Sequence, residues 1–159
     1  MSALPGDASL RLIVPDLEAT TLEGALSEMS EKLAAAGVVQ DPGALTQRLL
    51  ERERLGCTGL GSGIAIPHSK WKGIDEVVLA IGRSRPGIDF RSSDAVPVTL
   101  IFLILSPADA PGLHLQALAR ISRRLKTSAI AENLRRAETL EEIRDLWKET
   151  SSTLVEAHG

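Results

Sequence analysis

A glycine-rich stretch that ends in a histidine carries the residues of this chain best suited to chemistry. Gly59, Gly61 and Gly63 alternate, and the chain then runs through a short apolar segment to Pro67 and His68. Glycines permit positive φ angles and close approach of a ligand to the backbone, and consecutive backbone N–H groups can form an anion-binding concavity. Neutral imidazole is a nucleophile near pH 7, because its unperturbed pKa is about 6.5. The pattern therefore predicts a phosphoryl-accepting histidine beside an anion site.

Several polar side chains near this stretch are of the types that stabilise a phosphorylated histidine. The phosphoryl group brings close to two negative charges, which need N–H, hydroxyl, guanidinium or imidazole donors. The site predicted on this basis consists of His68 as acceptor, Arg52 and His114 as supporting side chains, and Thr58, Gly61, Ser62 and Gly63 as the phosphate-binding loop. His114 falls at the first turn of a predicted helix, where the cationic form is disfavoured and a neutral donor is expected.

Each of these residues also has a plainer interpretation. A glycine-rich turn is often only a tight connection between two segments. Arg52 lies in the last turn of a predicted helix, where a solvated cation suits the helix dipole, and His114 suits the surface at a helix start. His68 is less suited to a buried core, because it follows Ile-Pro at the end of a glycine turn.

The glycine pattern matches none of the common nucleotide-binding or hydrolase motifs. Its spacing is G-x-G-x-G, whereas a dinucleotide fold needs G-x-G-x-x-G at the opening of a helix, and a P-loop needs G-x-x-x-x-G-K-[ST]. Ser62 has a glycine directly on each side, so it does not stand in a G-x-S-x-G nucleophile elbow.

Composition narrows the range of partners and cofactors. The 159 residues carry a net charge of −3 and few aromatics (two Phe, two Trp, no Tyr), so nucleic acid is not an expected partner. Cys57 is the only cysteine and the three histidines lack metal-ligand spacing, so we expect no disulfide, no metal and no other cofactor. The longest apolar run, 96–105, is too short to span a membrane, and no signal segment opens the chain. These features predict a cytoplasmic protein without direct membrane insertion.

Apolar periodicity and turn residues outline helices on both sides of a group of strands. Extended segments are predicted at 10–14, 64–66, 77–81, 88–90 and 96–105, and helices at 20–36, 42–55, 113–126, 128–136 and 140–149. Arg85-Pro86-Gly87 is predicted as a turn between two strands, and the strand at 96–105 is apolar on both faces, as expected of a central strand. The chain is therefore predicted as one domain at 10–150 with flexible ends at 1–9 and 151–159, in which helices pack on a mixed sheet.

Capping patterns and apolar spacing place the helices more closely. The predicted helix starts are Thr20 with Glu23, Asp41 before Pro42, and Thr139 with Glu142. On the helix at 113–126, the predicted buried face consists of Leu115, Leu118, Ala119, Ser122 and Leu125.

The residues around His68 resemble the active-site signature of a known family. Arg52-Glu53 is followed at fixed spacing by T-G-x-G-x-G-x-A-x-P-H from Thr58 to His68, and His114-Leu115 opens a helix of alternating apolar and basic residues. This combination resembles the type-2 enzyme IIA domains of the bacterial phosphoenolpyruvate:sugar phosphotransferase system, in the fructose–mannitol class and its nitrogen-regulatory branch. The resemblance covers about residues 10–150, nearly the whole chain.

The resemblance implies an α/β fold with a mixed, roughly five-stranded sheet sandwiched by helices. It also implies that His68 is phosphorylated at Nε2 by the phosphohistidine of an HPr-like carrier protein, with Arg52 and His114 flanking the phosphoryl group. No metal or nucleotide is expected, because the donor is another phosphohistidine.

Within this family we expect a phosphocarrier of the nitrogen-regulatory type, whose phosphorylation state controls partner proteins, because no IIB or membrane IIC domain is fused to it. A sugar-uptake enzyme IIA that passes its phosphoryl group to a separate IIB protein is the alternative with the same chemistry. A non-phosphorylated interaction domain is the alternative of another class, and the intact set of Arg52, His68 and His114 argues against it. Cys57 is expected to be a packing residue, and Trp71 is either a contact surface near the site or a cover for the loop.

Overall fold

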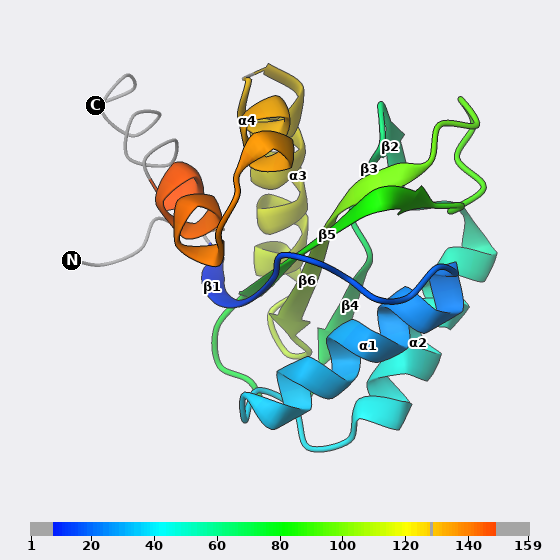
Figure 1. Ribbon diagram of the computed structural model, residues 1–159. Helices are drawn as coiled ribbons and strands as arrows, with labels where there is room; N and C mark the ends of the chain where they lie inside the picture. The colour runs from blue at the N-terminus through cyan, green and yellow to red at the C-terminus, as the bar shows by residue number, and fades with distance from the viewer. Residues whose placement is uncertain (1–7, 128, 149–159) are drawn as a thin grey trace.

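The computed structural model describes residues 8–127 and 129–148 and shows a sheet with helices on both faces (Figure 1). The elements are, in order, β1 (Ser9–Val14), α1 (Leu22–Ala35), α2 (Pro42–Leu55), β2 (Gly59–Gly61), β3 (Ile64–Ala65), β4 (His68–Trp71), β5 (Val78–Ile88), β6 (Val98–Pro107), α3 (Pro111–Thr127) and α4 (Ile130–Arg136). A further helix covers residues 140–148. The predicted α/β class is confirmed.

The central strand of the sheet is β6, as its apolar sequence predicts. The strand order is β1-β5-β6-β3-β2, and β4 also pairs with β6. The sheet is mixed, because β5 runs antiparallel to β6, whereas β3 and β4 run parallel to it. Every residue of β6 is buried except Thr99, which is partly buried. The sheet has six strands where roughly five are predicted.

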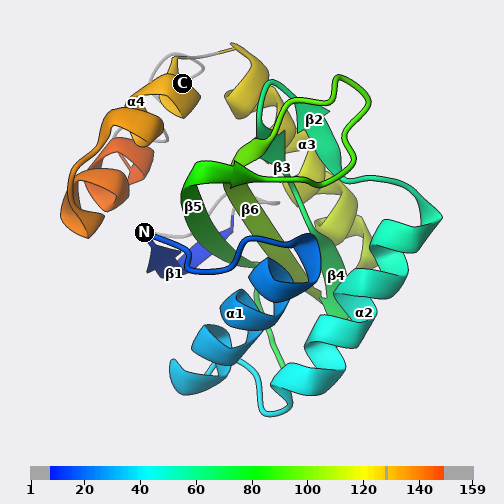
Figure 2. The same ribbon diagram turned by 45° about the vertical axis from the view of Figure 1, so that its right-hand side comes forward.

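Two apolar cores lie on the two faces of this sheet. Because successive strand residues point to opposite faces, β5 and β6 contribute to both cores. Leu26 of α1 and Leu49 of α2 belong to the first core. Ile121 of α3, Leu134 of α4 and Trp147 belong to the second. Figure 2 shows α1 and α2 on one side of the sheet and α3 and α4 on the other.

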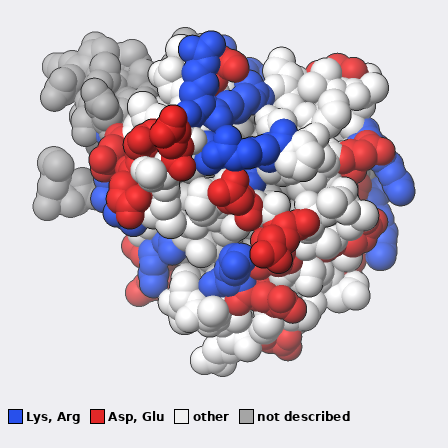
Figure 3. Space-filling model, viewed as in Figure 1, with Lys and Arg blue, Asp and Glu red and all other residues white. Residues whose placement is uncertain are grey.

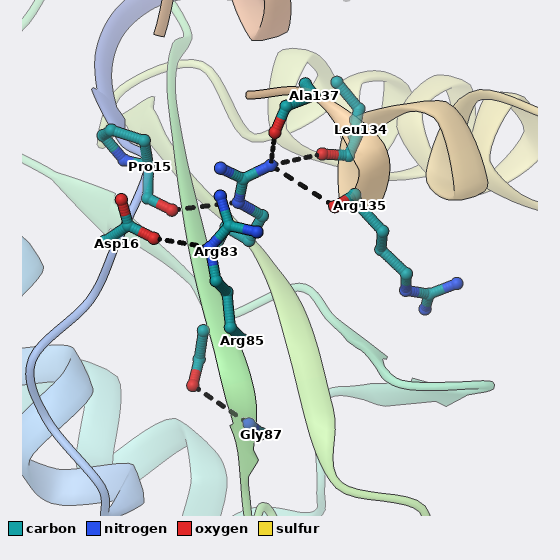
Figure 4. A network of polar contacts seen from close by, with 9 residues as sticks. Pro15, Asp16, Arg83, Arg85, Gly87, Leu134, Arg135 and Ala137 are labelled. Atoms are coloured by element: carbon teal, nitrogen blue, oxygen red, sulfur yellow. Dashed lines mark hydrogen bonds and ion pairs between the residues drawn. The ribbon is translucent and has the colours of Figure 1, made fainter. Parts of the chain in front are cut away.

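A buried arginine connects the sheet to the C-terminal end of α4 (Figure 4). Arg83 of β5 is only 1% exposed. Its Nε donates to the carbonyl of Pro15 at 2.9 Å, and its Nη1 donates to the carbonyls of Leu134, Arg135 and Ala137. A helix ends with carbonyls that have no partner within the helix, so this guanidinium supplies the donors that the end of α4 needs.

The helix starts follow the predicted caps with one correction. Asp41 caps α2 by accepting from the Ala44 N–H at 2.9 Å, and Pro42 is the first residue of the helix. The Thr139 hydroxyl likewise accepts from the Glu142 N–H at 3.1 Å, before the helix at 140–148. The predicted cap at Thr20 is wrong: Thr21 caps α1, because its side chain accepts from the Gly24 N–H.

Three further predictions fail where tertiary pairing decides the structure. The stretch after α2 is predicted as a loop with one short strand, yet it holds β2, β3 and β4. The predicted turn at 85–87 lies inside β5, which accommodates it by a shift of register between Arg83 and Ile88. The predicted buried face of α3 is wrong at Leu115, which is 69% exposed, and at Ala119, which is also exposed, because Ala117 and Ile121 point inward instead.

The predicted flexible ends are mostly outside the described residues. Ser9 is described and begins β1. The tail at 151–159 and most of 1–9 lie outside the described residues. Within residues 8–127 and 129–148, no helix is long and apolar enough to cross a membrane.

Candidate functional site

His68 is the first residue of β4, and the central strand fixes its place. β3 and β4 pair with the same side of β6, and they keep one register on both sides of Pro67. Between them, the Pro67 carbonyl accepts from the Ile104 N–H at 2.9 Å. Proline lacks an N–H and cannot donate to a strand ladder, so the pairing breaks at Pro67 and resumes at His68. The imidazole therefore lies on the first residue of β4, directly after the interruption in the pairing with β6.

The two nitrogens of the His68 ring have opposite partners. Nδ1 lies 2.7 Å from the carbonyl oxygen of Ile66, and Nε2 lies 3.2 Å from Nε of Arg52. A carbonyl oxygen can only accept and a guanidinium can only donate. Nδ1 therefore carries the hydrogen and Nε2 carries the lone pair. These contacts favour the neutral ring in the tautomer that has its lone pair on Nε2.

Arg52 reaches His68 from the last turn of α2, as its position predicts. Its Nη1 donates to the carbonyl of Gly56 at 2.9 Å, at the end of the same helix. That second bond fixes the guanidinium, so a positive charge stays beside Nε2 of His68. A guanidinium in this place can bind the oxygens of an incoming phosphoryl group.

His114 meets His68 from the other side of the site. It lies in the first turns of α3, is 9% exposed, and its Nδ1 is 2.8 Å from the hydroxyl oxygen of Ser106. The centroids of the two imidazole rings are 5.3 Å apart. The structure therefore brings together the three side chains that the sequence assigns to the acceptor and its supports.

Burial keeps both histidines neutral at physiological pH. The pKa of His68 lies below its usual 6.5, mainly because the ring is desolvated; the Ile66 carbonyl acts in the opposite direction. The pKa of His114 is lowered to about 4, first by burial and then by the charges of His68, Lys70 and Arg52. The sequence predicts a neutral His114 from its place at a helix start, and the structure gives desolvation as the larger cause.

An open hollow of about 220 Å³ lies beside His68. The residues that line it are Arg52, Cys57, Thr58, Gly59, Leu60, Ile66, His68, Leu118 and Ser122. The lining combines a guanidinium and an imidazole with apolar side chains from β2 and α3. A phosphoryl group presented by another protein can approach Nε2 from this side.

The turn between β2 and β3 makes its hydrogen bonds with Asp94 and Arg135, not with His68. Its Ser62 N–H donates to Asp94 at 2.8 Å, and the Ser62 carbonyl accepts from Arg135 of α4. Gly61 and Gly63 have φ angles of 85° and 80°, which suit the turn itself. No contact in the described structure joins Gly61, Ser62 or Gly63 to His68, whereas Thr58 lines the hollow. Phosphate binding by these three residues stays a prediction.

Two residues that the sequence pattern does not assign to the site hold its parts in place. Glu53 accepts from both the hydroxyl and the N–H of Thr58. Ser106 of β6 contacts the ring of His114. Glu53 follows Arg52 in the Arg-Glu pair of the motif, and this position in the motif could have identified it as a residue of the site. Nothing in the sequence connects Ser106 with His114.

Cys57 and Trp71 lie near the site in different ways. The Sγ of Cys57 is 3.2 Å from the carbonyl of Phe90 and 3.2 Å from the Gly59 nitrogen, which donates to it. Cys57 is nevertheless exposed, so the buried packing role that the sequence suggests is not confirmed. Trp71 ends β4 and lines a second hollow with Lys72, Gly73, Ile74, Ala108 and Asp109.

Among the described residues, no group of three or more His, Cys, Asp or Glu is placed to hold a metal ion.

Comparison with known proteins agrees with the geometry. Residues 9–150 match the family described as "Phosphoenolpyruvate-dependent sugar phosphotransferase system, EIIA 2". A nitrogen regulatory protein of Bradyrhizobium diazoefficiens is 42% identical over 77% of this chain and 80% of its own length. The fructose-specific EIIA component of Haloferax volcanii is 39% identical over 88% of this chain and 91% of its own. The crystal structure of the nitrogen regulatory protein IIA-Ntr from Neisseria meningitidis superposes with a TM-score of 0.76 at 31% identity, covering 86% of this chain and 94% of that one.

Proposed function

This chain belongs to the EIIA type-2 family of the phosphoenolpyruvate-dependent sugar phosphotransferase system, and from that premise we propose that it carries a phosphoryl group on Nε2 of His68. In this role it accepts the group from the phosphohistidine of an HPr-like carrier protein. It is a component of a phosphotransferase system, and the phosphohistidine is the chemical form in which it holds the group.

The observation that carries the proposal is the pair of hydrogen bonds on the His68 ring. The Ile66 carbonyl takes the hydrogen of Nδ1, so the lone pair stays on Nε2. Arg52 contacts that same nitrogen. A phosphoryl acceptor needs a neutral ring whose lone pair lies on one defined nitrogen, beside a cation that can bind the phosphoryl oxygens.

The transfer step balances without a proton leaving His68. The Nε2 lone pair forms a bond to phosphorus, the P–N bond of the donor breaks, and its electron pair returns to the donor imidazole. Nδ1 keeps its hydrogen and continues to donate to Ile66. As the P–N bond forms, the Arg52 Nε–H passes from Nε2 to a phosphoryl oxygen while Nη1 keeps its bond to Gly56, and His114 offers a neutral donor from the far side.

We propose regulation of partner proteins as the use of this phosphoryl group. The 42% identity to a nitrogen regulatory protein supports this use. The second candidate is sugar uptake, in which the group passes to a separate IIB protein, and the 39% identity to a fructose-specific EIIA component favours it. Both uses place the protein in the cytoplasm. A non-phosphorylated interaction domain is disfavoured, because Arg52, His68 and His114 are assembled at one place.

Phosphotransfer from a reconstituted donor tests the proposal. The protein is incubated with phosphoenolpyruvate, enzyme I and an HPr-type carrier, and its intact mass is measured beside that of the His68→Ala variant. An acid-labile phosphate on the wild type alone is expected. Absence of phosphate with every carrier tried, or the same phosphate on the variant, would overturn it. Subsequent transfer to a IIB cysteine that depends on sugar would favour the sugar-uptake candidate.

A further inference from the structure

Glu53 sits beside the site without touching the reacting atoms. It follows Arg52 in the last turn of α2, and it is partly buried. Its carboxylate accepts two hydrogen bonds from one residue: Thr58 Oγ1–H donates to one oxygen, and the Thr58 N–H donates to the other at 3.2 Å. Two bonds to a single residue fix the position of that residue more firmly than one.

Thr58 in turn holds the segment that leads into His68. Thr58 is 7% exposed, and its carbonyl accepts from the Ile66 N–H at 3.0 Å. Ile66 is 3% exposed, and its own carbonyl accepts from Nδ1 of His68 at 2.7 Å. A continuous line of contacts therefore runs from the Glu53 carboxylate through Thr58 and Ile66 to the imidazole.

Two adjacent residues of α2 thus act on the two nitrogens of one ring. Arg52 contacts Nε2 directly, and Glu53 acts on Nδ1 through Thr58 and Ile66. We propose that Glu53 is a positioning residue, which fixes the His68 tautomer by holding the Ile66 carbonyl in place through Thr58. Its role deepens the proposed function, because phosphoryl transfer needs the lone pair on Nε2.

The tautomer chemistry of the His68 imidazole supports this role of Glu53. A neutral imidazole in water exchanges between two tautomers, and in this site the Ile66 carbonyl at Nδ1 and the Arg52 donor at Nε2 together keep the hydrogen on Nδ1. A displaced Ile66 carbonyl releases that hydrogen, and part of the population then carries it on Nε2. Such molecules cannot attack phosphorus, and even a small misplacement of a reacting group costs up to about 10²-fold in rate.

The test compares histidine 15N chemical shifts in unphosphorylated wild type, Glu53→Ala, Glu53→Gln and Thr58→Val. This measurement needs no phosphoryl donor, so its result stands even if the proposed function fails. In the wild type we expect a lone-pair shift for Nε2 and an N–H shift for Nδ1 of His68. In Glu53→Ala and Thr58→Val both shifts should move toward the average of the two tautomers. Glu53→Gln can still bond to Thr58 and should stay close to the wild type.

Glu51→Ala is the matched control, because Glu51 is exposed on the same helix two residues away. It should keep the wild-type shifts. Phosphorylation rates measured on the same proteins should fall at least about tenfold for Glu53→Ala, with a positioning effect setting the scale, and should be unchanged for Glu51→Ala. A lower melting temperature of Glu53→Ala with wild-type shifts of both His68 nitrogens would show a merely structural role and overturn the proposal.

Discussion

At the scale of single residues, the proposed phosphoryl transfer depends on how the His68 ring is held. Its two nitrogens are distinguished by contacts alone: a carbonyl at one and a guanidinium at the other. The carbonyl belongs to Ile66, two residues before His68, whereas the guanidinium comes from α2, so the sequence can suggest both residues but only the folded chain brings them to opposite nitrogens. Arg52 and His114 are 62 residues apart in the printed sequence, yet both act on the same ring.

Arg52 should be needed for the transfer step itself. Arg52→Gln removes the cation beside Nε2 and should lower the rate of phosphorylation by about 10²-fold or more, the usual effect of removing a donor that stabilises developing charge. Rapid-quench measurement of acid-labile phosphate gives this rate. Arg54→Gln is the matched control, because Arg54 is exposed on the same helical turn. Equal rates for the two variants would contradict the role of Arg52.

His114 should make stability depend on pH in mildly acidic solution. Its pKa of about 4 in the folded protein lies below the usual 6.5, so the unfolded chain binds the proton first as pH falls. Stability should therefore be lost between pH 6.5 and pH 4, by at most about 3 kcal/mol. Glu53, whose pKa is raised by burial, acts in the opposite direction.

Urea unfolding of the wild type and His114→Gln at pH 7 and pH 5 measures this effect. The variant should lose less stability than the wild type over that interval, because Glu53 and the other groups are common to both. The same loss in the two proteins would show that His114 titrates normally.

At the scale of elements, the β2–β3 turn is held from two sides. Asp94 accepts from the Ser62 N–H, and Arg135 of α4 donates to the Ser62 carbonyl. The glycine pattern thus serves a tight turn as well as the path to His68. The Ser62 amide and carbonyl are bound by side chains of a loop and a helix that come later in the sequence. The glycine pattern alone therefore cannot reveal these two contacts.

Gly63→Ala should destabilise the protein by about 1–3 kcal/mol through its positive φ and its close neighbours. A Cβ there would meet Arg135 Nη2 and the Pro97 carbonyl, each at 3.1 Å. Gly73 also has a positive φ, but a Cβ there meets nothing within 4 Å. Chemical denaturation should therefore show a larger loss for Gly63→Ala than for Gly73→Ala, and a smaller loss would contradict the contacts at the turn.

The elements themselves were predictable where local chemistry decides them. Asp41-Pro42 fixes the start of α2, and Thr139 marks the start of the helix at 140–148. Local patterns fail at Thr20 and Thr21, because two adjacent threonines offer the same cap. They also fail at β2 and β4, which are short and hold glycine or polar residues, and which exist because they pair with β3 and β6. The proposed role of Glu53 depends on its hydrogen bonds with Thr58, which form only when the chain after α2 folds back. The motif therefore identifies Glu53 but does not reveal this role.

At the scale of the whole molecule, buried polar contacts join the segment after β1 to the end of α4. Arg83 links Pro15, just after β1, with the end of α4 (Figure 4). The surface is mixed in charge, and Figure 3 shows basic side chains with acidic ones directly beside them. On that face the basic side chains gather mainly toward the top, and acidic side chains lie beside and below them.

Arg83→Met should destabilise the fold by about 2–4 kcal/mol, because it leaves several buried carbonyls without a charged donor. Guanidinium unfolding curves measure this loss. The matched control is Arg85→Met on the same strand, whose ion pair with Asp16 is exposed and should contribute about 1 kcal/mol or less. Similar losses for the two variants would contradict the connecting role of Arg83.

The central claim is that Nε2 of His68 accepts the phosphoryl group, and the most direct measurement is NMR of the phosphorylated protein. With histidine labelled by 15N, coupling to 31P identifies the nitrogen that carries phosphorus. We expect coupling at Nε2 of His68, with Nδ1 still protonated and hydrogen-bonded to the Ile66 carbonyl. Phosphorus on Nδ1 of His68, or on another residue, would contradict it.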